Sequence, residues 1–248
     1  MKFLLTLFFT CFIFFLHAQY PTRSTNPEAL ASFQSGERLW TARDYREAQN
    51  FFRKAVSTDG NFVDAYNRLA ESFRMLDLID STILYYQKSL EVYPRGLKAH
   101  QDLAAAFQIK GDYQAAIDQY KELLRHYPDY PQAYYGMALV HFNQRQFPET
   151  IRTSEAAMRI FLSGKSFENA SDARMLAGQA YMNTGDYEKA VQYFKASKKQ
   201  MEDKPYYHYY LGFCYLRMGN KDKASENLAQ AEVMGYKIPV NIKDELKN

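Results

Sequence analysis

The residues of this chain that are best suited to chemistry lie close together near its C-terminal end, in the stretch "PYYHYYLGFCYLRMGN" at 205–220. Between 206 and 215 this stretch holds five tyrosines, a phenylalanine, His208 and Cys214. Phenol rings stack on ligands, and an imidazole with a thiolate binds metals or takes part in redox chemistry, but rings at this density also fill protein cores. Which of these roles applies depends on the helix faces that carry the residues.

The rest of the sequence holds no set of residues at catalytic or metal-ligand spacing. After the first 18 residues the remaining histidines are His100, His126 and His141, and none forms H-E-x-x-H or pairs with Cys214 at ligand spacing. "GKS" at 164–166 has the ending of a phosphate-binding loop, but Arg159 stands where that loop requires glycine. We therefore expect no enzymatic activity, no metal site and no cofactor, and we expect Cys214 to be a small buried residue rather than a reactive thiol.

The elements that must position these residues repeat along the chain. "RDYREAQNFF" at 43, "GDYQAAIDQY" at 111 and "GDYEKAVQYF" at 185 are near-copies. Equivalent positions recur 34 residues apart at 43, 77, 111 and 145, and again at 185 and 219, so that six residues are inserted between 145 and 185. A period of this length indicates a supersecondary unit that buries its apolar face only by stacking on its neighbours.

Within each period, small and large residues follow a fixed order. The repeat at 97–130 reads H-x2-L-A-x2-F from position 100, A-x3-Y from 116, and P at 128. This pattern resembles that of the tetratricopeptide-repeat family, and the resemblance extends over residues 29–238. It implies an all-α fold, an α-solenoid of six helix-turn-helix repeats that forms a right-handed superhelix. The implied repeats are 29–62, 63–96, 97–130, 131–164, 171–204 and 205–238.

The turns and ends of the repeats can also be placed. Glycine at 111, 185 and 219 stands between the two helices of a repeat, where a left-handed backbone costs glycine little, and aspartate at 44, 112 and 186 can cap the second helix. The insert at 165–170 is either a loop or a helix extension. We expect a disordered leader at 19–28 and a short capping helix at 239–248.

In this family the first helix of each repeat lines a concave groove, and the resemblance implies which places face it. In the last three repeats these places hold rings, methionines and amides, and they are our candidate partner-binding residues. They are Tyr135, Leu139, Phe142, Asn143, Met175, Gln179, Met182, Asn183, Tyr206, Tyr209, Phe213 and Arg217. The spacing 206, 209, 213 also forms one helical stripe without reference to any family. The alternative is that these rings cover seams between repeats or close the groove on itself.

The first 18 residues resemble a secretory signal peptide. Lys2 precedes an apolar run over 3–16, and Ala18 offers a small residue for cleavage. The run is shorter than the roughly 20 residues of a membrane-spanning helix, although an uncleaved anchor is the alternative. Cleavage would leave 30 basic and 28 acidic residues, a net charge of +2, since Lys2 is the only charge removed. This balance favours neither nucleic acid nor an anionic membrane as a partner.

These observations predict a non-catalytic scaffold that binds a peptide or protein segment in an envelope complex, without a membrane span in the mature chain. We expect it in the periplasm or at the outer-membrane periphery of a Gram-negative bacterium. One alternative is a carbohydrate- or nutrient-binding accessory protein at the outer membrane, because sugars also stack on aromatic rings. Another is an enzyme whose site does not match a known motif.

Overall fold

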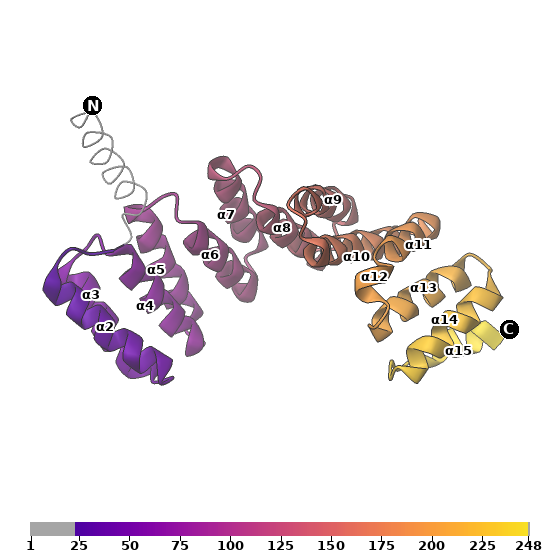
Figure 1. The fold of residues 1–248 in the computed structure, drawn as a ribbon, viewed down its shortest axis with the longest axis horizontal. Helices are drawn as coiled ribbons and strands as arrows, with labels where there is room; N and C mark the ends of the chain where they lie inside the picture. Colours follow the sequence, from indigo (N-terminus) through magenta and orange to yellow (C-terminus); the bar gives the residue numbers. More distant parts are fainter. Residues whose placement is uncertain (1–22, 248) are drawn as a thin grey trace, which may run out of the picture. The chain divides into compact units, whose positions relative to one another are not determined.

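The computed structural model describes residues 23–247, so the expected signal peptide at 1–18 lies outside the described residues. The described residues form helices joined by short turns and include no strand. The helices follow one another in tandem antiparallel pairs, which confirms the predicted all-α solenoid fold (Figure 1). The chain divides into two compact units, Met1–His126 and Tyr127–Asn248, which we call the N-terminal and C-terminal units.

The N-terminal unit contains three helix pairs, and the helices are 13 to 15 residues long. They are α2 (Pro27–Thr41) with α3 (Tyr45–Thr58), α4 (Val63–Met75) with α5 (Ile79–Val92), and α6 (Leu97–Lys110) with α7 (Tyr113–His126). We call α2, α4 and α6 the first helices of their pairs.

The C-terminal unit also contains three pairs, followed by one further helix. The elements are α8 (Pro131–Asn143) with α9 (Phe147–Ser163), α10 (Phe167–Thr184) with α11 (Tyr187–Ala196) and the short α12 (Lys198–Met201), α13 (Pro205–Arg217) with α14 (Lys221–Val233), and α15 (Val240–Lys247). The first helices of this unit are α8, α10 and α13.

The two helices of a pair approach closely because a small residue on the first faces a large one on the second. A Cβ atom added to Gly178 of α10 would lie 2.5 Å from Cε1 of Phe194 in α11. A Cβ atom on Gly212 of α13 would lie 2.7 Å from Cγ of Leu228 in α14. Phe194 is fully buried, so its ring occupies the space that the missing side chain leaves.

The turns inside the pairs have one backbone conformation. Gly111, Gly185 and Gly219 adopt positive φ angles of 85°, 84° and 75°, as predicted. The residues at the equivalent place in the other pairs are not glycine but also have positive φ; they are Arg43, Asp77 and Arg145. The repeated turn geometry is therefore set by the packing of each pair, and glycine only makes it less costly.

The predicted aspartate caps are present. The side chains of Asp44, Asp112 and Asp186 accept hydrogen bonds from backbone N–H groups of the first turn of α3, α7 and α11, at 3.1–3.2 Å. Each cap satisfies a donor that the helix itself leaves unpaired.

The insert between the fourth and fifth pairs lengthens the helices on both sides. Helix α9 has 17 residues and α10 has 18, and only a short turn with Lys165 at φ 57° separates them. Of the two possibilities that the sequence left open for 165–170, the structure therefore shows the helix extension.

The two ends of the described chain pack against their neighbours. Helix α2 begins at Pro27, inside the segment 19–28 that we expected to be a leader, and Ser24 is buried with its hydroxyl donating to Asp59. At the other end, α15 places Ile242 in the core of the last pair. Among residues 23–247, no helix is both long and apolar enough to span a membrane.

Replacement of Gly178 by alanine tests the close approach within a pair. We expect Gly178→Ala to lower the free energy of unfolding by about 1–3 kcal/mol, because Phe194 must leave its position. The control is Gly164→Ala, where the new Cβ would lie 3.6 Å from its nearest neighbour and should change stability little. Urea unfolding followed by circular dichroism measures both, and equal midpoints for the two variants would contradict the packing described here.

Candidate functional site

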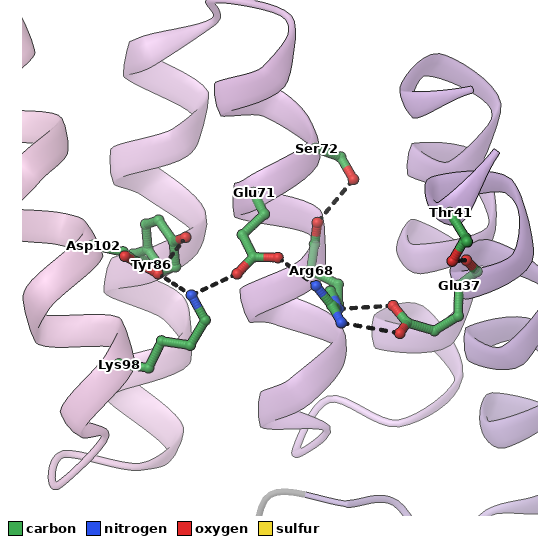
Figure 2. A network of polar contacts seen from close by, with 8 residues as sticks. All are labelled: Glu37, Thr41, Arg68, Glu71, Ser72, Tyr86, Lys98 and Asp102. Carbon is green, nitrogen blue, oxygen red and sulfur yellow. Dashed lines mark hydrogen bonds and ion pairs between the residues drawn. The ribbon is translucent and has the colours of Figure 1, made fainter. Parts of the chain in front are cut away.

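A network of charged side chains joins the first helices of the N-terminal unit (Figure 2). Arg68 of α4 makes two contacts with the Glu37 carboxylate of α2, Nε to Oε1 at 2.8 Å and Nη2 to Oε2 at 3.1 Å. Its Nη1 donates to Glu71 at 2.7 Å, and the other oxygen of Glu71 lies 2.6 Å from Nζ of Lys98 on α6. Lys98 also pairs with Asp102 one turn later. Three consecutive repeats are thus linked through alternating charges.

Glu71 is the centre of this network and is the member with the least exposure, 8% of its side chain. Burial alone raises the pKa of a carboxyl group. Here the hydrogen bonds and charges of Lys98 and Arg68 outweigh burial and hold the pKa of Glu71 below its ordinary value. Glu71 is therefore ionised at neutral pH and pairs with both cations.

Beside the network lies a cleft of ≈ 430 Å³. Its apolar part includes Leu30 and the rings of Phe33 and Phe62, whose centroids are 4.8 Å apart. Its polar part includes Asn67, whose Oδ1 accepts a hydrogen bond from the buried Ser89 hydroxyl at 2.7 Å. The cleft can accommodate an apolar side chain, and two of its cations, Arg68 and Lys98, are already bonded to carboxylates.

Our candidate residues did not include this network. Sequence spacing carried part of the signal, because Arg68 with Glu71 and Lys98 with Asp102 have the (i, i+3) and (i, i+4) spacing of helical ion pairs. The links from Glu37 to Arg68 and from Glu71 to Lys98 join different repeats, and no local pattern reveals them.

In the C-terminal unit, the predicted groove residues divide into accessible and covered groups. The first helices carry an exposed Leu139 and Tyr206, with 37% and 36% of their surface accessible, and a half-buried Tyr135. Burial is the largest cause that raises the pKa of Tyr135, followed by the negative charge of Asp172 and then the Tyr206 hydroxyl. Residues of α8, α10 and α13 thus lie near one another. We call Tyr135, Leu139 and Tyr206 the aromatic face.

Three of the predicted residues on α13 are engaged by other parts of the unit. The ring of Tyr209 stacks on that of Tyr236 with centroids 4.5 Å apart. The Arg217 guanidinium lies 4.9 Å from the ring centroid of Phe213 and forms an ion pair with Glu245 of α15. These side chains are only partly available to a partner because α15 and the segment before it cover them.

The remaining predicted residues are more varied. Met175 is 4% exposed and lies in the core of the last two pairs, so its assignment to an accessible groove is corrected. Met182 is half-buried against the same core, and Gln179 accepts a hydrogen bond from the Tyr210 hydroxyl at 3.4 Å. Phe142 meets the edge of Phe147, and Asn143 and Asn183 are exposed.

The dense stretch at 205–220 is mainly a packing element. Leu211, Gly212 and Tyr215 are buried. Cys214 is fully buried, and burial raises the pKa of its thiol to about 12, so that it stays protonated, as expected for a packed residue. His208 contacts the backbone carbonyl of Glu202 at 2.9 Å. Within the described part of the chain, no three His, Cys, Asp or Glu side chains form a group that could hold a metal ion.

The charge network can be tested by replacing Glu71 with glutamine. We expect Glu71→Gln to lower the free energy of unfolding at pH 7 by roughly 1–3 kcal/mol, because Arg68 and Lys98 lose their shared carboxylate. The folded pKa of Glu71 lies below its ordinary 4.5. Its contribution is therefore present above that pH and is lost as pH falls through the folded value.

The wild type should accordingly lose more stability than Glu71→Gln on acidification below about pH 4.5. The matched control is Glu28→Gln, because Glu28 makes an exposed ion pair with Lys54 at 3.2 Å. That change should cost less than about 1 kcal/mol. Urea unfolding at a series of pH values measures both effects. If the free energy of unfolding fell equally with pH below 4.5 in wild type and in Glu71→Gln, Glu71 would not hold the network together.

Two protein-family models match parts of this chain. A family model described as "TPR repeat" matches residues 104–144, and one described as "Anaphase-promoting complex, cyclosome, subunit 3" matches residues 157–231. The TPR repeat-containing protein MJ1428 of Methanocaldococcus jannaschii is 23% identical over 207 residues. This alignment covers 82% of the present chain and 35% of the relative, so the chain spans about a third of that protein.

Solved structures show the same fold. MamA has a TM-score of 0.63 at 24% identity, with 71% of this chain and 93% of MamA covered. YrrB, described as a TPR protein with an unusual peptide-binding site, has a TM-score of 0.61 at 22% identity over 74% of this chain and 92% of YrrB. PilF of Pseudomonas aeruginosa has a TM-score of 0.67 at 16% identity over 88% and 96%. These matches show that the chain has the fold of these repeat proteins, and the model described as "TPR repeat" matches residues 104–144 of the sequence.

Proposed function

We propose that this protein is a non-catalytic scaffold that binds an extended or helical segment of a partner protein on the aromatic face of its C-terminal unit. The observation that carries the proposal is the exposure of Leu139 on α8, beside Tyr135, and of Tyr206 on α13, both first helices of the unit. Tyrosine is a frequent interface anchor because its ring brings a large contact area at a small cost in conformational entropy. The peptide-binding site described for YrrB supports the same use of this fold.

The carbohydrate-binding alternative finds less support in the geometry. Trp40, the one tryptophan of the chain, is half-buried in the N-terminal unit. The guanidinium of Arg68 lies 4.7 Å from its ring centroid, and Tyr45 meets it edge-on. Its ring is therefore engaged by protein groups rather than open for stacking on a sugar.

Site-specific photo-cross-linking tests the proposed face. We expect benzoylphenylalanine at position 139 or 206 to cross-link the same partner segment in intact cells, identified by mass spectrometry. The same label at position 84 should not, because Leu84 is similarly exposed (45%) but lies on a second helix, α5. Leu139→Ala combined with Tyr206→Ala should weaken binding of the identified segment roughly tenfold or more, whereas Leu84→Ala should not. Equal cross-linking from all three positions would place binding elsewhere.

We further propose that the protein is exported to the bacterial cell envelope through residues 1–18, on the basis of their sequence. Fusion of residues 1–28 to mature alkaline phosphatase, which is active only after export, should give active enzyme in a Gram-negative host. The matched fusion with Phe8→Arg and Phe9→Arg interrupts the apolar run and should be inactive. Mass spectrometry of the processed protein should find Gln19 as its first residue, and an inactive wild-type fusion would overturn the export proposal.

A further inference from the structure

Some charged residues on the first helices of the C-terminal unit have a hydrogen-bond or ion-pair partner in the described part of the chain, and Asp172 does not. Helix α8 carries no Asp, Glu, Lys or Arg, and helices α10 and α13 carry Glu168, Asp172, Arg174 and Arg217. Both arginines are engaged within the unit: Arg174 donates to the Ala196 carbonyl at 2.7 Å, and Arg217 pairs with Glu245. The Asp172 carboxylate has no hydrogen bond or ion pair with any residue between 23 and 247. The unsatisfied charge on this surface is therefore negative.

Asp172 lies at the aromatic face. The ring of Tyr135 packs against a cluster that includes Ala170 and Ala173, the α10 residues that flank Asp172 in the sequence. The charge of Asp172 acts on the Tyr135 hydroxyl, and Tyr206 of α13 acts on the same hydroxyl. The Tyr135 ring on α8 thus packs beside the part of α10 that carries Asp172, and Tyr206 of α13 is close enough to act on the Tyr135 hydroxyl.

The surroundings of Asp172 disfavour its negative charge. Partial burial, followed by repulsion from Glu168 one turn earlier on α10, raises the pKa of Asp172, although its side chain remains open to solvent. Lys204, directly before α13, interacts electrostatically with Tyr206 and Glu168. Its ammonium group forms an ion pair with Asp203 at 3.0 Å. Arg68 and Lys98 stabilise the negative charge of Glu71 by ion pairs, whereas no cation among residues 23–247 forms an ion pair with Asp172.

We propose that Asp172, together with the rings of Tyr135 and Tyr206, receives the side chain of a lysine or arginine from the partner segment. This inference rests on the proposed function and specifies its partner: a segment in which a basic residue lies close to an apolar one. The cation would pair with the carboxylate and lie against the phenol rings, which attract cations through their faces. The apolar neighbour would contact Leu139, and an acidic segment would be repelled.

Selection from a displayed library of random peptides tests the inference without knowledge of the partner. Wild type should enrich peptides that combine Lys or Arg with an apolar residue, and Asp172→Asn should lose the preference for the basic residue. The matched control, Asp222→Asn, changes an exposed aspartate on the second helix α14 and should select the same peptides as wild type. The thermal midpoint of Asp172→Asn should not fall, because Asp172 has no partner in the fold to lose.

A selected peptide then allows a double-mutant cycle. Replacing its arginine with citrulline, which is neutral and of similar shape, should weaken binding to wild type roughly two- to fivefold, the range of an accessible ion pair. The same replacement should leave binding to Asp172→Asn unchanged. Peptides enriched without a basic residue, or equal losses on both proteins, would overturn the role of Asp172 and leave the scaffold function standing. A selection that enriches no peptide would overturn both.

Discussion

A glycine or alanine at one place in each helix pair is the constraint on which the fold depends. That place lies 16 residues before a buried residue of the second helix, as in Gly36 with Phe52 and Gly178 with Phe194. In both pairs an added Cβ would lie 2.5 Å from the ring, so the close approach requires glycine. Pairs with alanine at this place, such as Ala70 before Tyr86, also bury both residues. The recurrence of one contact gives every pair similar packing, which allows successive pairs to stack.

This constraint explains how much of the fold could be predicted from the sequence. The 34-residue period located the helix pairs and their turns, and it did so even where the residue type gave no signal, as at Arg43 and Asp77, which have positive φ without being glycine. The period also located the six inserted residues. The period could not show whether these residues form a loop or extend a helix, because both arrangements leave the later repeats at the same spacing. In the structure α9 and α10 are the longer helices.

The candidate site was less predictable, because helical spacing gives the direction of a side chain and not what covers it. The stripe of Tyr206, Tyr209 and Phe213 was identified from spacing alone, yet Tyr236 stacks on Tyr209 and the arginine over Phe213 is paired with α15. Tyr236 and the Glu245 partner of that arginine both come from beyond the helix that carries the stripe. Met175 is buried for a related reason, since the core of the last two pairs closes over it.

The two units use charge on their first helices in different ways. In the N-terminal unit each carboxylate of the network pairs with a cation, and these ion pairs link three repeats. The two cations that pair with Glu71 offset the free-energy cost of burying its charge. In the C-terminal unit the two arginines of the first helices are bonded to other groups, and Asp172, near the half-buried ring of Tyr135, pairs with no cation among the described residues. A carboxylate without an ion pair in its own chain does not stabilise the fold through one. A partner that supplies a cation can therefore form a new ion pair with it, and no ion pair within the free protein has to be broken first.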